Sequence, residues 1–473
     1  MKKNIIGRKR ELTLLREALL TPHAELIAVY GRRRIGKTFL VKEYFNNKFD
    51  FYATGIFEGN KKEELEAFCQ GFPQDFLKTR PAIKEWLDAF ITLRDYLMTK
   101  KGRTVVFLDE LPWFDVPPSR FLKAFEWFWN SWGSTRSKLK LIVCGSATSW
   151  MRNKFISHKG GLYNRTTTQI YLAPFKLHET KLLLNHNGIK WTKLSILDAY
   201  MALGGVPYYL NMLRGDLSVD ENINRLFFEE GSALKNEYSF LLKSLFKEDE
   251  LYRRIIDTIA GKNKGLTRQE IIQLSHLQDN GRLSSALNTL IDCDFIREYS
   301  AYGKASRDSL YQVIDPFVLF YKRFVEKYKG RDERHWINNI QSQQRRSWSG
   351  IAFELVSLIH LPQIKEALGI QGIATWTGSW IYRGKEDEKG AQIDLLIDRQ
   401  DKIINLCEMK YSSRLFETTK SLAKEITERE EIFAIQSGTR KSIVNILVTP
   451  VGEKNGKYKG LFSRVITMEA LFK

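Results

Sequence analysis

The sequence predicts an α/β protein built from several domains. Its 473 residues are too many for one hydrophobic core, and 43% of them are hydrophobic, which is enough for two or three cores. Roughly the first 235 residues alternate short β-like runs with helical stretches, the pattern of a parallel sheet covered by helices. Residues from about 240 to 325 are rich in helical patterns, and the last part of the chain returns to mixed α/β.

A glycine-rich octamer follows the first apolar run, residues 26–30. It has the pattern G-x-x-x-x-G-K-T and consists of Gly31, Arg32, Arg33, Arg34, Ile35, Gly36, Lys37 and Thr38. The glycines let backbone N–H groups curl round a triphosphate, and the helical pattern that follows adds a favourable dipole. We expect Lys37 to reach the β- and γ-phosphates of ATP and Thr38 to ligate Mg²⁺. The alternative is a glycine-rich turn beside a solvated lysine.

A second apolar strand, residues 105–108, ends in Asp109 and Glu110 about seventy residues after the octamer. A carboxylate at the end of a buried strand can hold Mg²⁺ through water, and the next one can be the general base for attack on the γ-phosphate. The sequence therefore predicts Asp109 as a metal ligand and Glu110 as the base. A third strand, residues 139–144, runs into Ser146.

Together these motifs resemble the archaeal-type ATPase family, a branch of P-loop ATPases near the AAA+ and STAND proteins. The opening IGRKREL at 6–12, CGSA at 144–147 and GGVPYYL at 204–210 share the resemblance, which covers about residues 1–235. It implies that Arg8 lies near the adenine, that 204–210 belong to a helical lid, and that Ser146 contacts the γ-phosphate and the nucleophilic water. Arg165, at the end of GLYNR, is a candidate arginine finger, supplied in cis or by a neighbour; the alternative is an ordinary surface arginine.

The middle segment carries the pattern of three helices followed by two strands. Thr267 and Glu270 form the spacing of a capping box, residues 280–293 have a helical apolar stripe, and residues 295–299 pair with 309–313 as a hairpin. This is a winged-helix-like order. The third helix offers few basic residues for reading DNA, so contact with a protein or a role as spacer fits equally well.

The C-terminal part shows a second group of acidic residues. Glu354 lies in the helical pattern 348–360, Asp394 in the strand candidate 393–397, and Glu408 and Lys410 at the end of 403–409. An Asp and a Glu from adjacent strands can hold a divalent metal, and a lysine beside them can stabilise charge on a phosphate. The set resembles the PD-(D/E)XK restriction-endonuclease-like fold, although Ile393 replaces the usual proline. The resemblance implies that Glu354, Asp394 and Glu408 hold Mg²⁺ and that Asp394, Glu408 and Lys410 are catalytic; the alternative is an ordinary exposed pair at a strand end.

Charge and composition limit the partners. Lysine and arginine outnumber the acids by 74 to 55, a net charge of +19, which favours an anionic partner, nucleic acid first. We expect DNA more than RNA. The four cysteines show no CxxC spacing, and we find no apolar run long enough for a membrane span and no signal peptide. We therefore expect a cytoplasmic protein with ATP and Mg²⁺ as cofactors, and we leave a homo-oligomer open.

The expected architecture has three parts. Residues 1–235 form a P-loop parallel-sheet ATPase domain with a helical lid, 240–325 a winged-helix-like domain, and 330–473 a mixed α/β nuclease-like domain, with 327–346 as the best linker candidate. We predict an ATPase that gates or drives a Mg²⁺-dependent nuclease-like domain acting on nucleic acid. The alternative is a STAND-like nucleotide switch or scaffold whose C-terminal domain only binds. A third hypothesis, a transcriptional regulator, ranks last.

Overall fold

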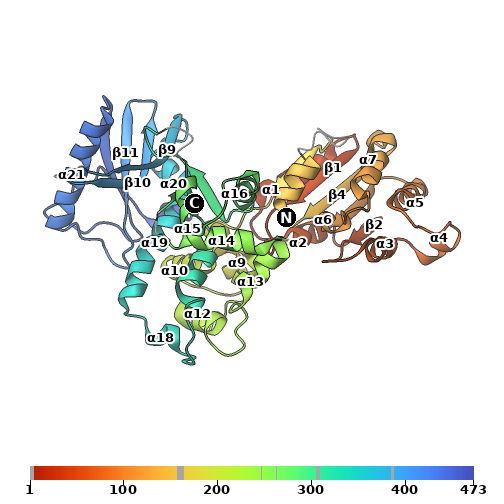
Figure 1. Ribbon diagram of the computed structural model, residues 1–473, viewed down its shortest axis with the longest axis horizontal. Helices are drawn as coiled ribbons and strands as arrows, with labels where there is room; N and C mark the ends of the chain where they lie inside the picture. Colours follow the sequence, from red (N-terminus) through yellow and green to blue (C-terminus); the bar gives the residue numbers. More distant parts are fainter. Residues whose placement is uncertain (1–4, 157–164, 247, 263, 305–308, 385–387) are drawn as a thin grey trace. The chain divides into compact units, whose positions relative to one another are not determined.

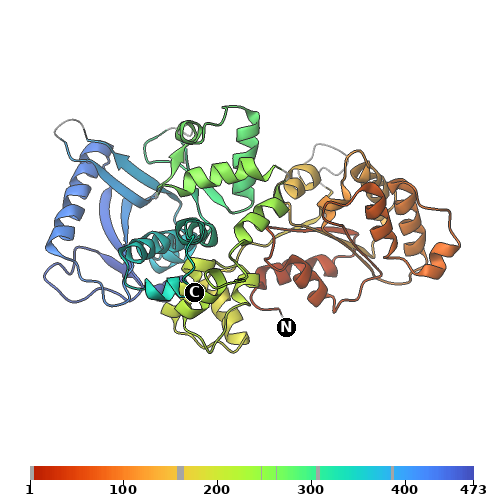
Figure 2. The ribbon, with the colours of Figure 1, turned by 60° about the horizontal axis from the view of Figure 1, so that its bottom comes forward.

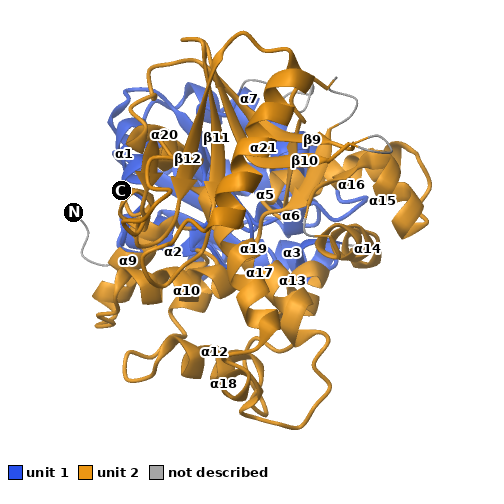
Figure 3. Cartoon of the chain, turned by 90° about the vertical axis from the view of Figure 1, so that its left-hand side faces the viewer, with its two compact units in different colours: residues 1–174, 244–247 blue, residues 175–243, 248–473 orange. Residues whose placement is uncertain are grey.

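The computed structural model describes residues 5–156, 165–246, 248–262, 264–304, 309–384 and 388–473. The chain divides into two compact units, which Figure 3 colours separately: residues 1–174 with 244–247, and residues 175–243 with 248–473. In the described part of the chain no helix has the length and apolar character needed to cross a membrane, and the cysteines form no disulfide.

The first unit is built on a five-stranded sheet (Figure 1). Its strands are β1 (Glu25–Tyr30), β2 (Phe51–Thr54), β3 (Thr104–Asp109), β4 (Leu139–Gly145) and β5 (Thr168–Tyr171), in the order β2-β3-β4-β1-β5. Every neighbouring pair is parallel, so the carboxyl ends of all five strands meet at one edge of the sheet. The parallel sheet predicted for this region is confirmed, and β4 lies between β1 and β3.

Helices cover both faces of this sheet because its strands are apolar on both sides. Leu26 and Ala28 enter one core, while Ile27 and Val29 enter the other. The helical segments are α1 (Lys9–Leu20), α2 (Lys37–Tyr44), α3 (Lys61–Cys69), α4 (Gln74–Lys78), α5 (Trp86–Met98), α6 (Leu111–Phe114), α7 (Phe121–Ser131) and α8 (Thr148–Trp150), with short turns η1 (Gly133–Thr135) and η2 (Met151–Ile156).

The second unit begins with the helices of the predicted lid. They are α9 (Leu177–His186), α10 (Lys193–Leu203), α11 (Pro207–Leu210), α12 (Val219–Phe227) and α13 (Glu237–Leu245), which ends at the boundary with the first unit. The GGVPYYL segment lies at the start of α11. Gly205 is required there, because a Cβ on it would lie 1.8 Å from the backbone oxygen of Phe175.

The next segment follows the order helix, strand, helix, helix, strand, strand. Its elements are α14 (Asp249–Ala260), β6 (Leu266–Thr267), α15 (Arg268–Ser275), α16 (Gly281–Asp292), β7 (Ile296–Tyr299) and β8 (Leu310–Val313). The predicted hairpin is confirmed as the antiparallel pair β7–β8, to which β6 is added. The predicted capping box is also confirmed, since Glu270 N donates to Thr267 Oγ1 and Thr267 N donates to Glu270 Oε2.

The polar stretch 327–346 is more than a linker. After α17 (Pro316–Phe320) and η4 (Tyr321–Val325) it carries α18 (His335–Asn338) and the start of α19 (Gln343–Ile359). Trp336 is buried within it and packs against Phe320 and Phe324. An aromatic side chain that contributes to the core overrides the polar composition around it.

The C-terminal domain is a second five-stranded sheet in the order β13-β12-β11-β10-β9. The central strand β10 is antiparallel to both of its neighbours, β9 and β11, whereas β11, β12 and β13 are parallel. Helices α19 (teal) and α21 (blue) pack against this sheet (Figure 2). The remaining elements are α20 (Leu361–Ala367), β9 (Thr375–Tyr382), β10 (Ala391–Arg399), β11 (Ile403–Met409), α21 (Lys420–Ser437), β12 (Ser442–Val448), β13 (Arg464–Ile466) and α22 (Met468–Leu471).

Candidate functional site

The glycine-rich octamer forms the turn between β1 and α2. Gly31 and Gly36 have φ values of 145° and 88°, and Arg34 adopts 71°, so three residues of the octamer lie in the left-handed half of φ space. A Cβ on Gly31 would lie 2.3 Å from the backbone oxygen of Leu172, so only glycine fits there. The turn therefore brings backbone N–H groups to the start of α2, the geometry in which such loops cradle phosphates.

The side chains of the octamer divide by burial. Arg32 and Ile35 are buried, whereas Arg33 is half-buried. Lys37 is 5% exposed, and its Nζ donates to the backbone oxygen of Arg32 at 2.9 Å, so the ammonium lies back over the loop. The backbone of Arg32 and Ile35 can still border a phosphate, while their side chains anchor the loop.

Thr38 and Asp109 meet at the carboxyl edge of the sheet. Thr38 Oγ1 donates to Asp109 Oδ1 at 3.1 Å, although the two residues come from α2 and the end of β3. Burial, and then the charge of Glu110, raises the pKa of Asp109 above its usual value. A hydroxyl and a buried carboxylate form the hard-oxygen donor set that Mg²⁺ prefers. These two residues therefore fit the magnesium ion that the octamer implies.

Glu110 is held by Ser146. The residue adopts a left-handed conformation with φ of 47°, and its Oε2 accepts from Ser146 N at 3.0 Å and from Ser146 Oγ at 2.7 Å. Ser146 lies just beyond β4, the strand between β1 and β3. The sequence assigns Ser146 a contact with the γ-phosphate, whereas in this structure its polar groups fix the carboxylate of Glu110.

Arg8 lies against the loop. It is 5% exposed, and its guanidinium donates to the backbone oxygens of Ile35 at 3.2 Å and Ala173 at 2.7 Å. Arg8 therefore connects the N-terminal segment with the octamer and with the chain that leaves β5. The contact with adenine stays a prediction.

Arg165 is exposed and lies shortly before β5. The residues that precede it in the GLYNR motif, 161–164, lie outside the described residues. Its assignment as an arginine finger stays a prediction.

The C-terminal candidates come from three elements. Glu354 lies on α19, Asp394 on β10, and Glu408 on β11, with Lys410 directly after that strand. Leu395 pairs with Cys407, so Asp394 and Glu408 are neighbours on adjacent strands, and a break in the register follows Ile393. Burial, and then the charge of Asp394, raises the pKa of Glu354 to about 8, which reflects how closely the structure gathers these carboxylates.

These carboxylates do not fit a divalent metal as they are arranged. Glu408 Oε1 pairs with Lys410 Nζ at 2.7 Å, and Glu408 Oε2 pairs with an arginine of α21, Arg429, at 2.6 Å. Asp394 Oδ1 accepts from Gln392 Nε2 at 2.6 Å. Among the described residues no group of three or more His, Cys, Asp or Glu side chains is placed to hold a metal ion.

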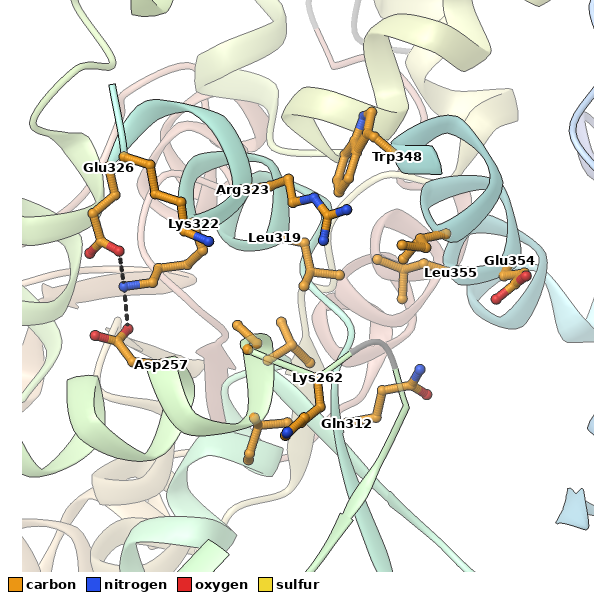
Figure 4. Close-up of a pocket in the computed structure, with 16 residues that line it drawn as sticks. Asp257, Lys262, Gln312, Leu319, Lys322, Arg323, Glu326, Trp348, Glu354 and Leu355 are labelled. Carbon is orange, nitrogen blue, oxygen red and sulfur yellow. Dashed lines mark ion pairs between the residues drawn. The ribbon is translucent and has the colours of Figure 1, made fainter. Parts of the chain in front are cut away.

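Two cavities border Glu354. One of about 250 Å³ lies between α14, η4 and α19, and Figure 4 shows Lys322 paired with Asp257 and Glu326 at its far end. The other, of about 330 Å³, has both Glu354 and Asp394 in its wall.

The opposite wall of the larger cavity comes from the β7–β8 hairpin. Arg297 and Tyr299 of β7 and Gln312 of β8 line it, and the Arg297 guanidinium donates through Nε and an Nη to Gln312 Oε1 at 2.9 and 2.7 Å. The hairpin thus faces the candidate carboxylates from within the same unit.

Comparison with known proteins supports the first of the two sites. Residues 5–213 match the family described as an ATPase domain predominantly from Archaea. The match supports an archaeal-type ATPase. An uncharacterized protein of Methanocaldococcus jannaschii is 25% identical over 442 residues, which are 91% of this chain and 92% of that protein. An uncharacterized ATP-binding protein of the same organism is 46% identical over 43 residues, 9% of this chain and 73% of that protein.

Solved structures give similarities at low identity. A Walker-type ATPase of Pyrococcus abyssi is 20% identical with a TM-score of 0.48, and the match covers 68% of this chain and 97% of that one. The ORC2 protein of Aeropyrum pernix, solved as complexes with ADPNP and ADP, is 16% identical with a TM-score of 0.46, and the match covers 67% of this chain and 94% of that one.

Sequence reasoning missed two residues. Arg429 is the only base in the run Glu428–Glu431, a pattern typical of a solvent-exposed helix face, so the sequence shows no sign of its pair with Glu408. Arg297 showed no sign either, because its alignment with Gln312 depends on the register of the hairpin.

Proposed function

We propose that this chain binds ATP at Gly31–Thr38 and hydrolyses it at the carboxyl edge of the first sheet. The observation that carries the proposal is the meeting of Thr38 with Asp109 and of Glu110 with Ser146 at that edge. A phosphate loop, a metal-ligating pair and a positioned carboxylate are the parts that phosphoryl transfer to water requires.

Each residue has a distinct task in this proposal. The loop N–H groups and Lys37 bind the β- and γ-phosphates. Thr38 and Asp109 would hold Mg²⁺, which supplies positive charge to the phosphate oxygens. Glu110 accepts a hydrogen bond from the attacking water and takes its proton as the water oxygen bonds to the γ-phosphorus and the bond from that phosphorus to the bridging oxygen of the leaving ADP breaks. Ser146 keeps the Glu110 carboxylate at the site, and Arg165 is the proposed arginine finger.

We further propose that ATP turnover gates the C-terminal domain on nucleic acid. The order α19, β9, β10, β11, α21, β12, with Glu354 on α19, Asp394 on β10 and Glu408 on β11, supports a nuclease-like domain, although Glu408 is paired with Lys410 and Arg429 in this structure. The net charge of +19 supports an anionic partner, and we propose that this partner is nucleic acid, DNA more than RNA. The predicted winged-helix-like domain, residues 240–325, lies in the sequence between the ATPase region and these residues, and we propose it as the connector of the two activities.

One experiment tests both activities in the same reactions. ATP turnover and strand cleavage are followed with single- and double-stranded DNA and RNA, with Mg²⁺, for wild type, Lys37→Ala, Lys410→Ala and the control Lys48→Ala. We expect Lys37→Ala to lose ATP turnover and ATP-dependent cleavage, because the phosphates lose their cation. Lys410→Ala should lose cleavage alone, and the exposed Lys48 should tolerate the change.

The outcomes separate the candidate functions. ATP turnover that persists in Lys37→Ala would contradict the ATPase assignment. Turnover without cleavage of any substrate would favour the nucleotide switch whose C-terminal domain only binds.

A further inference from the structure

We infer that Arg429 is the built-in counter-ion of the C-terminal site and that it excludes a divalent metal from Glu408 in the resting protein. The inference rests on the proposed nuclease-like function of this domain and concerns the regulation of that site. The pairing with Arg429 explains why these carboxylates do not fit Mg²⁺ as they are arranged.

Both oxygens of Glu408 are already paired. Arg429 lies 2.6 Å from Oε2 and Lys410 Nζ lies 2.7 Å from Oε1. The side chains of Glu408 and Arg429 are 9% and 12% exposed, so water screens their pair only slightly. A lysine two residues after the glutamate is part of the motif, but the guanidinium comes from a different element, α21. Arg429 is therefore the group that distinguishes this site from a metal-binding one.

A metal and the guanidinium compete for the same oxygen. Mg²⁺ requires oxygen ligands at about 2.1 Å, and its charge would repel a guanidinium held against the same carboxylate in a poorly solvated setting. Breaking a buried ion pair is costly because it leaves one charge without a partner. The carboxylate therefore keeps Arg429 unless another interaction takes the guanidinium away.

The remaining carboxylates do not compensate. Asp394 is engaged by Gln392 at 2.6 Å, and no metal-binding group of three side chains is found among the described residues. With Glu408 held by Arg429, Asp394 and Glu354 are the carboxylates that remain, and both lie in the wall of the larger cavity. A metal held by these two alone would be weak, because strong Mg²⁺ and Ca²⁺ sites in proteins use several oxygen ligands.

The pair is also incomplete in a way that permits release. The Nε of Arg429 is buried and makes no hydrogen bond within the described structure. Glu425 lies four residues earlier on α21, the spacing at which side chains on one helix face meet. Arg429 can therefore exchange Glu408 for Glu425 without unfolding the helix, or for a phosphate of a bound strand, since guanidinium binds both groups through paired hydrogen bonds. Either exchange would free Glu408.

The test measures metal binding directly. Binding of Mn²⁺ to the full chain, without ATP or nucleic acid, is followed by the electron paramagnetic resonance signal of the free ion. Asp394→Asn identifies the fraction that belongs to this site. Arg429→Gln removes the charge but keeps a donor for Glu408, and Arg429→Lys keeps the charge. Lys424→Gln removes a cation from an exposed part of the same helix, where it pairs with Glu428 at 3.6 Å, and is the matched control.

We expect Arg429→Gln to bind Mn²⁺ at least tenfold more tightly than wild type at a site that Asp394→Asn abolishes. Arg429→Lys and Lys424→Gln should behave as wild type. The inference fails if wild type shows the same Asp394-dependent affinity as Arg429→Gln, or if Arg429→Gln gains no site. If an Arg429 variant does not fold, Mn²⁺ binding by wild type and by Asp394→Asn can still be compared, and tight binding that only wild type shows would contradict the inference. This experiment measures Mn²⁺ binding and not strand cleavage. Its result therefore stays valid if the domain proves to have no nuclease activity.

Discussion

Ser146 contributes two hydrogen bonds to one oxygen of Glu110, one from its backbone and one from its hydroxyl. The backbone bond depends on the path of the chain after β4, whereas the hydroxyl bond depends on the side chain alone. A carboxylate that activates water must be held at the correct position, because reactivity depends steeply on alignment. Ser146 therefore acts through Glu110 as a positioning residue.

Replacing Ser146 with alanine isolates the hydroxyl. The lost bond has a charged acceptor and is worth about 1.5–3 kcal/mol, so we expect kcat for ATP to fall about tenfold or more while KM changes little. Ser146→Thr keeps a hydroxyl and should recover most of the rate. A large rise in KM with an unchanged kcat would instead assign Ser146 to ATP binding.

At the residue scale the sequence predicts what is local. Gly31–Thr38 and Asp109-Glu110 are contiguous motifs, and the structure brings Thr38 to Asp109 because parallel strands end at the same edge. The bond from Ser146 to Glu110 joins residues 36 positions apart and depends on side-chain rotamers. The pair of Glu408 with Arg429 likewise requires the packing of α21 on the sheet, which no motif encodes.

At the scale of whole elements, the helix α3 holds the loop that follows β2. Glu64 is fully buried on α3, and its two carboxylate oxygens accept from Ile56 N at 3.0 and 3.2 Å. Gly55 in the same loop donates its N–H to Asp109 O at 3.1 Å. The helix thus holds a loop that touches the strand carrying the proposed metal ligand.

Glu64 makes the stability of the protein depend on pH. Burial raises the pKa of Glu64 to about 7, above the ordinary value of 4.5 for a glutamate. The unfolded chain therefore releases this proton at a lower pH than the folded one, so the contribution of Glu64 to stability falls as pH rises between about 4.5 and 7 and stays low above.

We expect Glu64→Gln to stabilise the protein above pH 7 by about 1–3 kcal/mol, because the amide oxygen still accepts from Ile56 N and carries no charge. Below about pH 4.5 the two proteins should be equally stable. Thermal unfolding of wild type and Glu64→Gln across this pH range measures the difference in stability, with Glu66→Gln as the control at an exposed position of the same helix. An effect equal at all pH values would contradict the account.

Helices and strands could be predicted where the residues within the element itself form the hydrophobic or capping pattern. The capping box of Thr267 and the strand 403–409 come from neighbouring residues, and both are observed. The helix that contains Glu354 begins at Gln343 rather than near 348, because Ser342 caps it and accepts from Arg345 N. The burial of Trp336 in the expected linker depends on aromatic partners outside that stretch, Phe320 and the more distant Phe228.

At the scale of the whole molecule, the predicted lid lies in the same compact unit as the C-terminal domain. Lys176 Nζ donates to Ile359 O at 2.9 Å, and Tyr411 OH donates to Asp198 Oδ1 at 2.6 Å. These bonds join segments about two hundred residues apart, so no local pattern could indicate them. They join α10 to the chain that follows β11, two residues beyond that strand, and the residue before α9 to the end of α19.

The central claim is that this chain turns over ATP with Glu110 as the base. The most direct measurement is steady-state ATP hydrolysis by wild type and Glu110→Gln, with ATP affinity measured in parallel and Glu17→Gln, on the exposed side of α1, as control. The account predicts that Glu110→Gln binds ATP with the wild-type affinity and hydrolyses it at least a hundredfold more slowly. Hydrolysis by Glu110→Gln at the wild-type rate, or no hydrolysis by wild type, would contradict it.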